Sequence, residues 1–300
     1  MTKENLSTKG AEALFGAAMA YALTGIFVRE VSPMWTDKAQ VAVRFGIVLF
    51  FLAIYQLLRK NRVWVPSKKL APILFGGLLS TIMILSFTIA IGKTTIANVL
   101  FVFYAANMIT SFLLGTLGLK EHVSRAKLIA LGFAILGLAV YSGSIASGNQ
   151  GIILSIIAGV AGGTINLINK QLTGVDRTAV LVLWFALVAA LSSSWLLLSG
   201  DQIIRTASLH LSLLTIVFAL VIIVGAFLTL YGFQHFDVNI GSVIMSTELV
   251  FAAIMAYFLF NEVPQAHELA GGAFILIGSI VGSGIFDKPK SSLQPIAQPD

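Results

Sequence analysis

Two ionisable side chains lie deep inside long apolar stretches of this sequence. Glu248 has at least ten uncharged residues on each side. Arg44 lies about one and a half helical turns into the stretch 38–59. Because a charged group at the centre of a bilayer costs about 2.5 kcal/mol or more, we expect Glu248 to face the protein interior or a hydrated cavity. There it binds a ligand ammonium, carries a proton, or stays protonated in a hydrogen bond to a neighbouring helix.

Arg44 allows three interpretations. Its guanidinium can pair with Glu248, bind a carboxylate of a ligand, or snorkel to the outer interface of a membrane. Several uncharged polar and aromatic residues also fall inside apolar stretches, where they pack in the core or line a cavity that supplies hydrogen-bond partners. The other candidates for a ligand-binding cavity are Tyr104, Asn107, Ser80, Met83, Phe87, Asn166, Asn169, Trp184 and Tyr231.

The sequence lacks the residues that metal binding, catalysis or ATP binding would require. The sequence has no cysteine, and its four histidines fall at the ends of apolar stretches or between them, so we expect no metal site. It contains no His-Glu-x-x-His, Gly-x-Ser-x-Gly or Gly-x₄-Gly-Lys-Ser/Thr motif. We therefore expect neither an enzyme nor a cofactor, and no ATPase subunit is required.

The composition indicates which elements hold these side chains. Charged residues make up only 11% of the chain and hydrophobic residues 57%, and the mean hydropathy is +0.93. A soluble domain carries about 25% charged residues, so the sequence predicts an all-α integral membrane protein. About 20 apolar residues cross a bilayer as a helix. The apolar stretches predict ten membrane-spanning helices, at residues 11–30, 38–59, 70–92, 94–117, 125–145, 151–171, 177–199, 209–235, 238–260 and 268–286.

The distribution of Lys and Arg predicts the orientation of these helices. With the N-terminus inside, fourteen of these residues fall in cytoplasmic segments and four in outside segments, as is typical of inner-membrane proteins. We therefore predict a multi-pass protein of the cell inner (plasma) membrane with both termini in the cytoplasm. The net charge of +6 then reflects loops near anionic membrane lipid, and we expect no nucleic-acid partner.

The two halves of the chain share a sequence pattern. Glu-x₆-Leu-x₄-Phe-x₃-Gly-x₂-Val-x-Ser-Gly starts at Glu121 and again at Glu262, and the alignment before it, offset by a three-residue gap, places Tyr104 over Glu248. Since each half has five predicted helices, the two copies must cross the membrane in opposite directions, as in many transporters that bind ligands in a central cavity. The predicted parts are a cytoplasmic segment 1–10, repeats 11–145 and 151–286, a linker 146–150 and a disordered cytoplasmic tail 287–300.

The second half resembles a known family. Residues 244–262, followed by Leu269-Ala-Gly-Gly-Ala-Phe-Ile-Leu-Ile-Gly278, are similar to the second repeat of the drug/metabolite transporter superfamily, EamA type. The resemblance extends from about Ala11 to Phe286 and includes the pair Arg44-Phe45. Within the superfamily the chain is most similar to the YddG-type aromatic amino-acid exporters. The prolines that the family often has in helices four and nine are replaced here by residues 105–107 and Leu249.

Together these features predict a secondary transporter that works by alternating access and needs no cofactor. The resemblance implies that it exports small amphipathic metabolites, with neutral or aromatic amino acids as the small-molecule substrate. The alternatives are export of another metabolite or drug class, and a channel. The sequence leaves the oligomeric state open.

Overall fold

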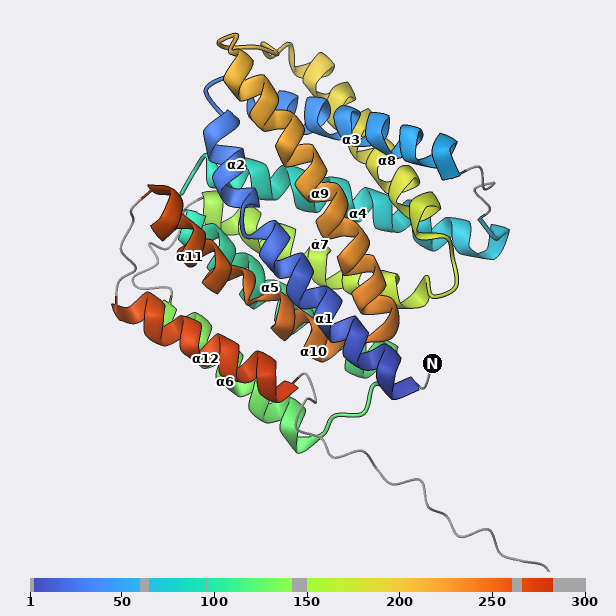
Figure 1. Cartoon of the computed structure of the whole chain (residues 1–300), viewed down its shortest axis with the longest axis vertical. Helices are drawn as coiled ribbons and strands as arrows, with labels where there is room; N and C mark the ends of the chain where they lie inside the picture. The colour runs from blue at the N-terminus through green and yellow to red at the C-terminus, as the bar shows by residue number, and fades with distance from the viewer. Residues whose placement is uncertain (1–2, 60–64, 95, 142–149, 261–265, 283–300) are drawn as a thin grey trace, which may run out of the picture.

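The computed structural model describes residues 3–59, 65–94, 96–141, 150–260 and 266–282, and this part of the chain is a bundle of α-helices (Figure 1). The residues form continuous helices because apolar side chains follow one another over 17 or more positions in most of them, and a helix satisfies its own backbone hydrogen bonds where water is absent. The helices are α1 (Lys3–Tyr21), α2 (Thr24–Val31), α3 (Asp37–Arg59), α4 (Ser67–Ile91), α5 (Ile96–Gly118), α6 (Arg125–Tyr141), α7 (Gln150–Gln171), α8 (Arg177–Ser199), α9 (Leu209–His235), α10 (Val238–Met245), α11 (Glu248–Phe260) and α12 (Ala266–Gly282).

Eight segments of the described chain are long and apolar enough to span a membrane. They carry exposed apolar side chains such as Leu57, Leu198 and Leu209, each more than three quarters exposed, which suits contact with lipid. The predicted spans 125–145 and 268–286 correspond to the 17-residue helices α6 and α12, and each span extends beyond the described residues.

The predicted span 238–260 is not one helix, which corrects the expectation from the sequence. It is broken at Ser246 and Thr247, whose hydroxyls donate to the carbonyls of Val243 and Ile244 at 2.7 Å each. The backbone N–H groups of Ser246 and Thr247 bond to the same two carbonyls. This three-residue spacing is tighter than an α-helix and ends α10.

The predicted span 11–30 is also broken, between Tyr21 and Thr24. Its helix begins earlier than expected, because α1 includes most of the segment 1–10 that we predicted to precede the first span. Of the predicted linker, only Gln150 is described and it begins α7. The predicted tail 287–300 lies outside the described residues.

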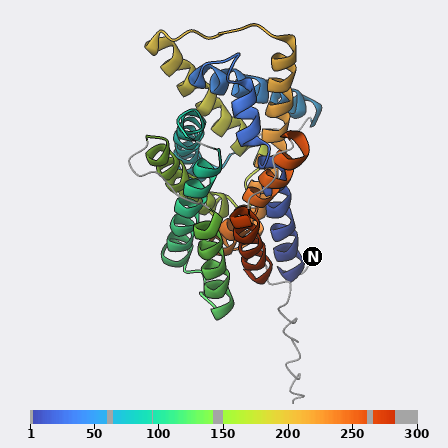
Figure 2. The same ribbon diagram turned by 90° about the vertical axis from the view of Figure 1, so that its left-hand side faces the viewer.

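Helices from the two halves of the chain pack directly on one another. α6 lies along α12, α5 along α7, α1 along α9, and α3 along α8. Figures 1 and 2 place the α6–α12 pair and the α3–α8 pair at opposite ends of the long axis of the bundle. Two glycines allow close approach: a Cβ atom at Gly137 of α6 would lie 2.7 Å from the Gly271 carbonyl oxygen, and one at Gly159 of α7 would lie 2.4 Å from that of Phe103.

Candidate functional site

A cavity of about 180 Å³ lies inside the bundle, between helices of both halves. Its wall is mostly apolar and aromatic, with a small number of polar groups, which is the usual character of a small-molecule site. Ten of the eleven residues proposed from the sequence line it: Arg44, Ser80, Met83, Phe87, Tyr104, Asn107, Asn166, Asn169, Trp184 and Glu248.

Glu248 is placed in the cavity by the break between α10 and α11. It is the first residue of α11 and is 5% exposed. Its carboxylate accepts a hydrogen bond from the hydroxyl of Tyr104, which comes from α5 in the other half of the chain. The alignment of the two repeats places these residues over one another, and the structure brings them into contact. The N-terminus of α11 adds a favourable partial positive charge for the carboxylate.

Arg44 lies in the cavity wall, and the described part of the chain offers it no acidic partner within ion-pair distance. It is 3% exposed, so its guanidinium does not snorkel to an interface. Nη2 lies 3.5 Å from the Thr88 hydroxyl oxygen, while Nε and Nη1 have no hydrogen-bond partner. The guanidinium carbon lies 4.3 Å from the centre of the Phe218 ring. The ion pairs found among the described residues do not join Arg44 to Glu248, so the structure shows neither that pair nor a guanidinium at an interface.

A group of amides joins α5 to α7 beside the cavity. The Asn166 side-chain amide donates to the Asn107 side-chain oxygen at 3.1 Å and to the Ser111 hydroxyl at 3.0 Å. Asn169, one turn further along α7, is 1% exposed and its Oδ1 has no partner. An unpaired buried acceptor costs free energy, so a ligand that donates a hydrogen bond here recovers that cost.

Aromatic residues fix the shape of the wall. The Trp184 indole N–H donates to the Ile73 carbonyl at 2.7 Å, which orients the ring across α4. A Cβ atom at Gly76 would lie 2.6 Å from this ring, so Gly76 makes room for Trp184. The rings of Phe87 and Phe103 lie 5.4 Å apart, edge to face.

Tyr231 is the one candidate that the structure places elsewhere. Its ring lies 4.4 Å from that of His235 and 4.6 Å from the Arg177 guanidinium, near one end of α9. The sequence analysis missed four hydroxyl-bearing residues of the lining: Tyr21, Thr24, Thr88 and Thr229. Tyr21 could have been found in the same way as Tyr104, because its polar hydroxyl also lies inside an apolar stretch. The threonines could not have been found from the sequence, because their hydroxyls can also bond to the carbonyl four residues earlier in the same helix.

No group of three or more metal-binding side chains was found within the described ranges. The cavity wall holds one carboxyl group and one guanidinium among mainly apolar residues.

The sequence profile of the EamA-like transporter family matches residues 8–143 and again residues 149–283. The chain belongs to the EamA-like transporter family. It is therefore a multi-pass membrane transporter and not an enzyme, and the family domain occurs twice in it, once in each half.

Named relatives agree with this assignment. The pseudopaline exporter CntI of Pseudomonas aeruginosa strain PAO1 is 23% identical over 266 residues, which cover 88% of this chain and 92% of that protein. An uncharacterized transporter of Archaeoglobus fulgidus is 24% identical over 285 residues, 91% of this chain and 95% of that one. A solved crystal structure with 15% identity superposes with a TM-score of 0.75 over 91% of this chain and 95% of its own, so the two share a fold.

Proposed function

We propose that this EamA transporter exports small amphipathic metabolites that carry both an ammonium and a carboxylate, with neutral and aromatic amino acids as the preferred class. The observation that carries the proposal is the presence of one acidic and one basic side chain in the cavity, Glu248 and Arg44, with two guanidinium nitrogens of Arg44 lacking a hydrogen-bond partner. A ligand with both charges satisfies each group, and its side chain contacts the aromatic wall. A neutral or purely cationic ligand leaves the Arg44 guanidinium without a partner, which costs binding free energy.

The size of the cavity supports a small substrate. Drug-sized ligands occupy pockets of about 300–1,000 Å³, whereas this cavity holds about 180 Å³. An amino acid is therefore a better match than a drug or a nucleotide-linked sugar. A sugar nucleotide would also require several cations, and Arg44 is the cation among the lining residues.

We infer further that the chain crosses the inner membrane ten times, with α6 and α12 as the fifth and tenth spans and both termini in the cytoplasm. Two observations support inverted halves that alternate access. The family domain matches each half separately. The packing is also reciprocal. α4 of the first half lies along α7 of the second half. The helix that corresponds to α4 in the second half is α9, the helix that corresponds to α7 in the first half is α1, and α9 lies along α1 in the same way.

A second candidate substrate comes from the relatives. One of them is named a pseudopaline exporter, so export of that metabolite is an alternative to export of simple amino acids.

Flux in proteoliposomes tests the proposal and separates the candidates. Vesicles containing the purified protein are loaded with labelled phenylalanine, tryptophan, leucine, lysine, glutamate or pseudopaline, and release is compared with that from empty vesicles. We expect release of the apolar amino acids. Release of pseudopaline alone would favour the alternative, and release of none of them would contradict the proposed substrate class. Cells that make the protein should also tolerate toxic aromatic analogues better than cells that lack it.

Cysteine labelling tests the topology, because the chain has no cysteine of its own. Ser67 and Gln202 are both exposed in the structure. We expect a Ser67→Cys variant to be shielded from an impermeant reagent outside intact cells and a Gln202→Cys variant to react. The reverse pattern would overturn the proposed orientation.

A further inference from the structure

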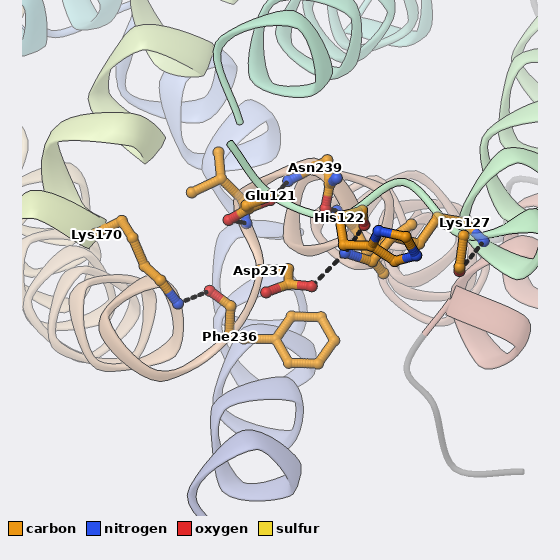
Figure 3. Close-up of polar contacts among 10 residues, drawn as sticks. Glu121, His122, Lys127, Lys170, Phe236, Asp237 and Asn239 are labelled. Carbon is orange, nitrogen blue, oxygen red and sulfur yellow. Dashed lines mark hydrogen bonds and ion pairs between the residues drawn. The ribbon is translucent and has the colours of Figure 1, made fainter. Parts of the chain in front are cut away.

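A second polar cluster lies where α5 and α7 end and α10 begins (Figure 3). Glu121, in the loop after α5, accepts hydrogen bonds from the backbone N–H groups of Val238 at 2.8 Å and Asn239 at 3.2 Å. It therefore caps the N-terminus of α10 with a carboxylate from the other half of the chain. Burial raises the pKa of Glu121 above the usual value, and the hydrogen bonds from Val238 and Asn239 partly offset that rise.

Two lysines reinforce this cap. The Lys127 ammonium is ion-paired with the Asp237 carboxylate and donates to the His122 carbonyl at 2.8 Å. The Lys170 ammonium, at the end of α7, donates to the Phe236 carbonyl at 2.7 Å. The corner between α9 and α10 is thus held from two directions.

The position of Glu121 is itself fixed by the end of α5. Its backbone N–H bonds to the Gly115 carbonyl at 3.0 Å, and Lys120 adopts a left-handed conformation with φ of 55°. A Cβ atom at Gly115 would lie 3.0 Å from the Glu121 carboxylate, so the glycine leaves room for it. The loop therefore points the carboxylate at α10.

α10 runs from this cluster to the cavity, because Glu121 bonds to its first two residues and Met245 at its other end lines the cavity. All eight of its residues are buried, and the break after it leads to Glu248 in the cavity wall. The segment 238–248 is held at both ends by one stretch of the other half, because Tyr104 of α5 binds Glu248 and Glu121 binds Val238 and Asn239. Asn239 is fully buried, yet its side-chain Nδ2 has no partner. The observed position of α10 therefore leaves a polar group unsatisfied, and water would satisfy that group if α10 moved.

We propose that α10 is a movable plug at this end of the cavity, and that Glu121 is a positioning residue which holds the plug, and with it Glu248, in the closed position. The proposal rests on the proposed transport function, since only a transporter needs this end to open. A substrate ammonium that binds Glu248 competes with the Tyr104 hydroxyl for the carboxylate and so weakens one of the two attachments of the plug. The remaining attachment, at Glu121, then sets how readily this end opens.

Reactivity of a buried thiol tests the plug without any substrate. Ser242 of α10 is 0% exposed, and a Ser242→Cys variant of the full-length protein in detergent should react slowly with N-ethylmaleimide. Glu121→Ala removes both acceptors from the N-terminus of α10, and we expect it to speed the reaction about tenfold or more. Glu121→Gln keeps one acceptor oxygen and should restore most of the protection. Tyr104→Phe, which releases the other end, should also speed the reaction.

A matched control lies at the far end of α8. Asp201 is an exposed carboxylate that accepts from Lys38 at 2.7 Å and from Ser199 at 3.0 Å, so Asp201→Ala likewise removes a carboxylate with two hydrogen bonds, but away from the plug. We expect it to leave the Ser242→Cys reaction unchanged. Equal protection in Glu121→Ala and the parent, at unchanged melting temperature, would overturn the proposal, as would equal acceleration by Asp201→Ala. These outcomes differ from a failure of the substrate assignment, which changes flux but not thiol reactivity.

Cross-linking provides a second measurement. A short thiol bridge between Lys127→Cys and Asp237→Cys should stop transport of whatever substrate the protein carries, and reduction of the bridge should restore it. Full transport by the bridged protein would show that this corner does not open and would overturn the proposal.

Discussion

Glu248 and Arg44 share one apolar cavity but do not neutralise each other. Glu248 has the Tyr104 hydroxyl as a partner, while the guanidinium of Arg44 lies 3.5 Å from the Thr88 hydroxyl and over the Phe218 ring. A ligand therefore gains most free energy where it brings an anionic group to Arg44 and a cationic group to Glu248. The two ends of the ligand can be tested separately.

The first prediction concerns Glu248. Glu248→Gln keeps the shape of the side chain but removes its charge, so we expect transport to fall about tenfold or more, because a hydrogen bond to a charged group contributes about 1.5–3 kcal/mol. The melting temperature should change little. Glu248→Ala, in contrast, should also lower the melting temperature, since it leaves a void and an unpaired Tyr104 hydroxyl. Near-normal, pH-dependent flux in Glu248→Gln would show that the carboxyl is structural, and the binding role would then pass to Tyr104 and Asn107.

The second prediction concerns Arg44. Arg44→Lys keeps the charge but loses the planar fork that binds a carboxylate through two N–H groups. We expect both Arg44→Lys and Arg44→Ala to weaken binding of phenylalanine about tenfold or more, while binding of phenylalanine amide, which lacks the carboxylate, changes by less than about twofold. Competition against labelled phenylalanine gives both values. An equal loss for acid and amide would contradict contact between Arg44 and a carboxylate.

The third prediction concerns the pH response of Glu121. Because burial raises its pKa in the closed position, protonation favours closure relative to an open state in which the carboxyl is solvated. As the pH rises from the ordinary carboxyl value of about 4.3 through the raised pKa, opening should increase and then level off. The reaction rate of Ser242→Cys measures opening. The same variant carrying Glu121→Gln corrects for ionisation of the thiol, and identical pH profiles in the two proteins would refute the prediction.

At the scale of the elements, the sequence predicts the long helices well because apolar runs bounded by charges leave few alternatives. It fails at the two breaks, after Tyr21 and before Glu248. The break before Glu248 depends on how Ser246 and Thr247 use their hydroxyls, and serine and threonine also occur in unbroken transmembrane helices. Apolarity also cannot show which face of a helix meets the cavity. Tyr231 lies outside the cavity lining, and most of the ten candidates that line it were chosen as polar groups that require partners.

The fourth prediction tests the contact between α5 and α7. A Cβ atom at Gly159 would lie 2.4 Å from the Phe103 carbonyl oxygen, and backbone atoms cannot move aside at low cost. We expect Gly159→Ala to destabilise the protein by about 1–3 kcal/mol and to lower its melting temperature. Gly132→Ala in α6 is the matched control, because nothing lies within 4 Å of the added atom and alanine is the better helix former. Equal melting temperatures for the two variants would contradict close packing at Gly159.

At the scale of the whole molecule, the α3–α8 pair joins the two halves at both of its ends. Lys38 at the start of α3 pairs with Asp201 beyond the end of α8 at 2.7 Å, and Arg59 at the end of α3 pairs with Asp176 before the start of α8 at 3.0 Å. Exposed ion pairs contribute little individually, about 0–1 kcal/mol. Here, however, they flank a contact that runs along both helices, so separating α3 from α8 breaks the packing and both ion pairs together.

The last prediction follows from this contrast between the two regions. If α10 moves while α3 and α8 stay together, a thiol bridge between Lys38→Cys and Asp201→Cys should leave transport within about twofold of the unbridged protein, a change of about 0.4 kcal/mol. The bridge between Lys127→Cys and Asp237→Cys should stop it. Both pairs are ion pairs between the two halves. The two bridges therefore differ chiefly in whether transport requires the helices that they join to separate. Arrest by the Lys38–Asp201 bridge, reversed on reduction, would show that α3 and α8 also separate and that the halves rock apart as whole units.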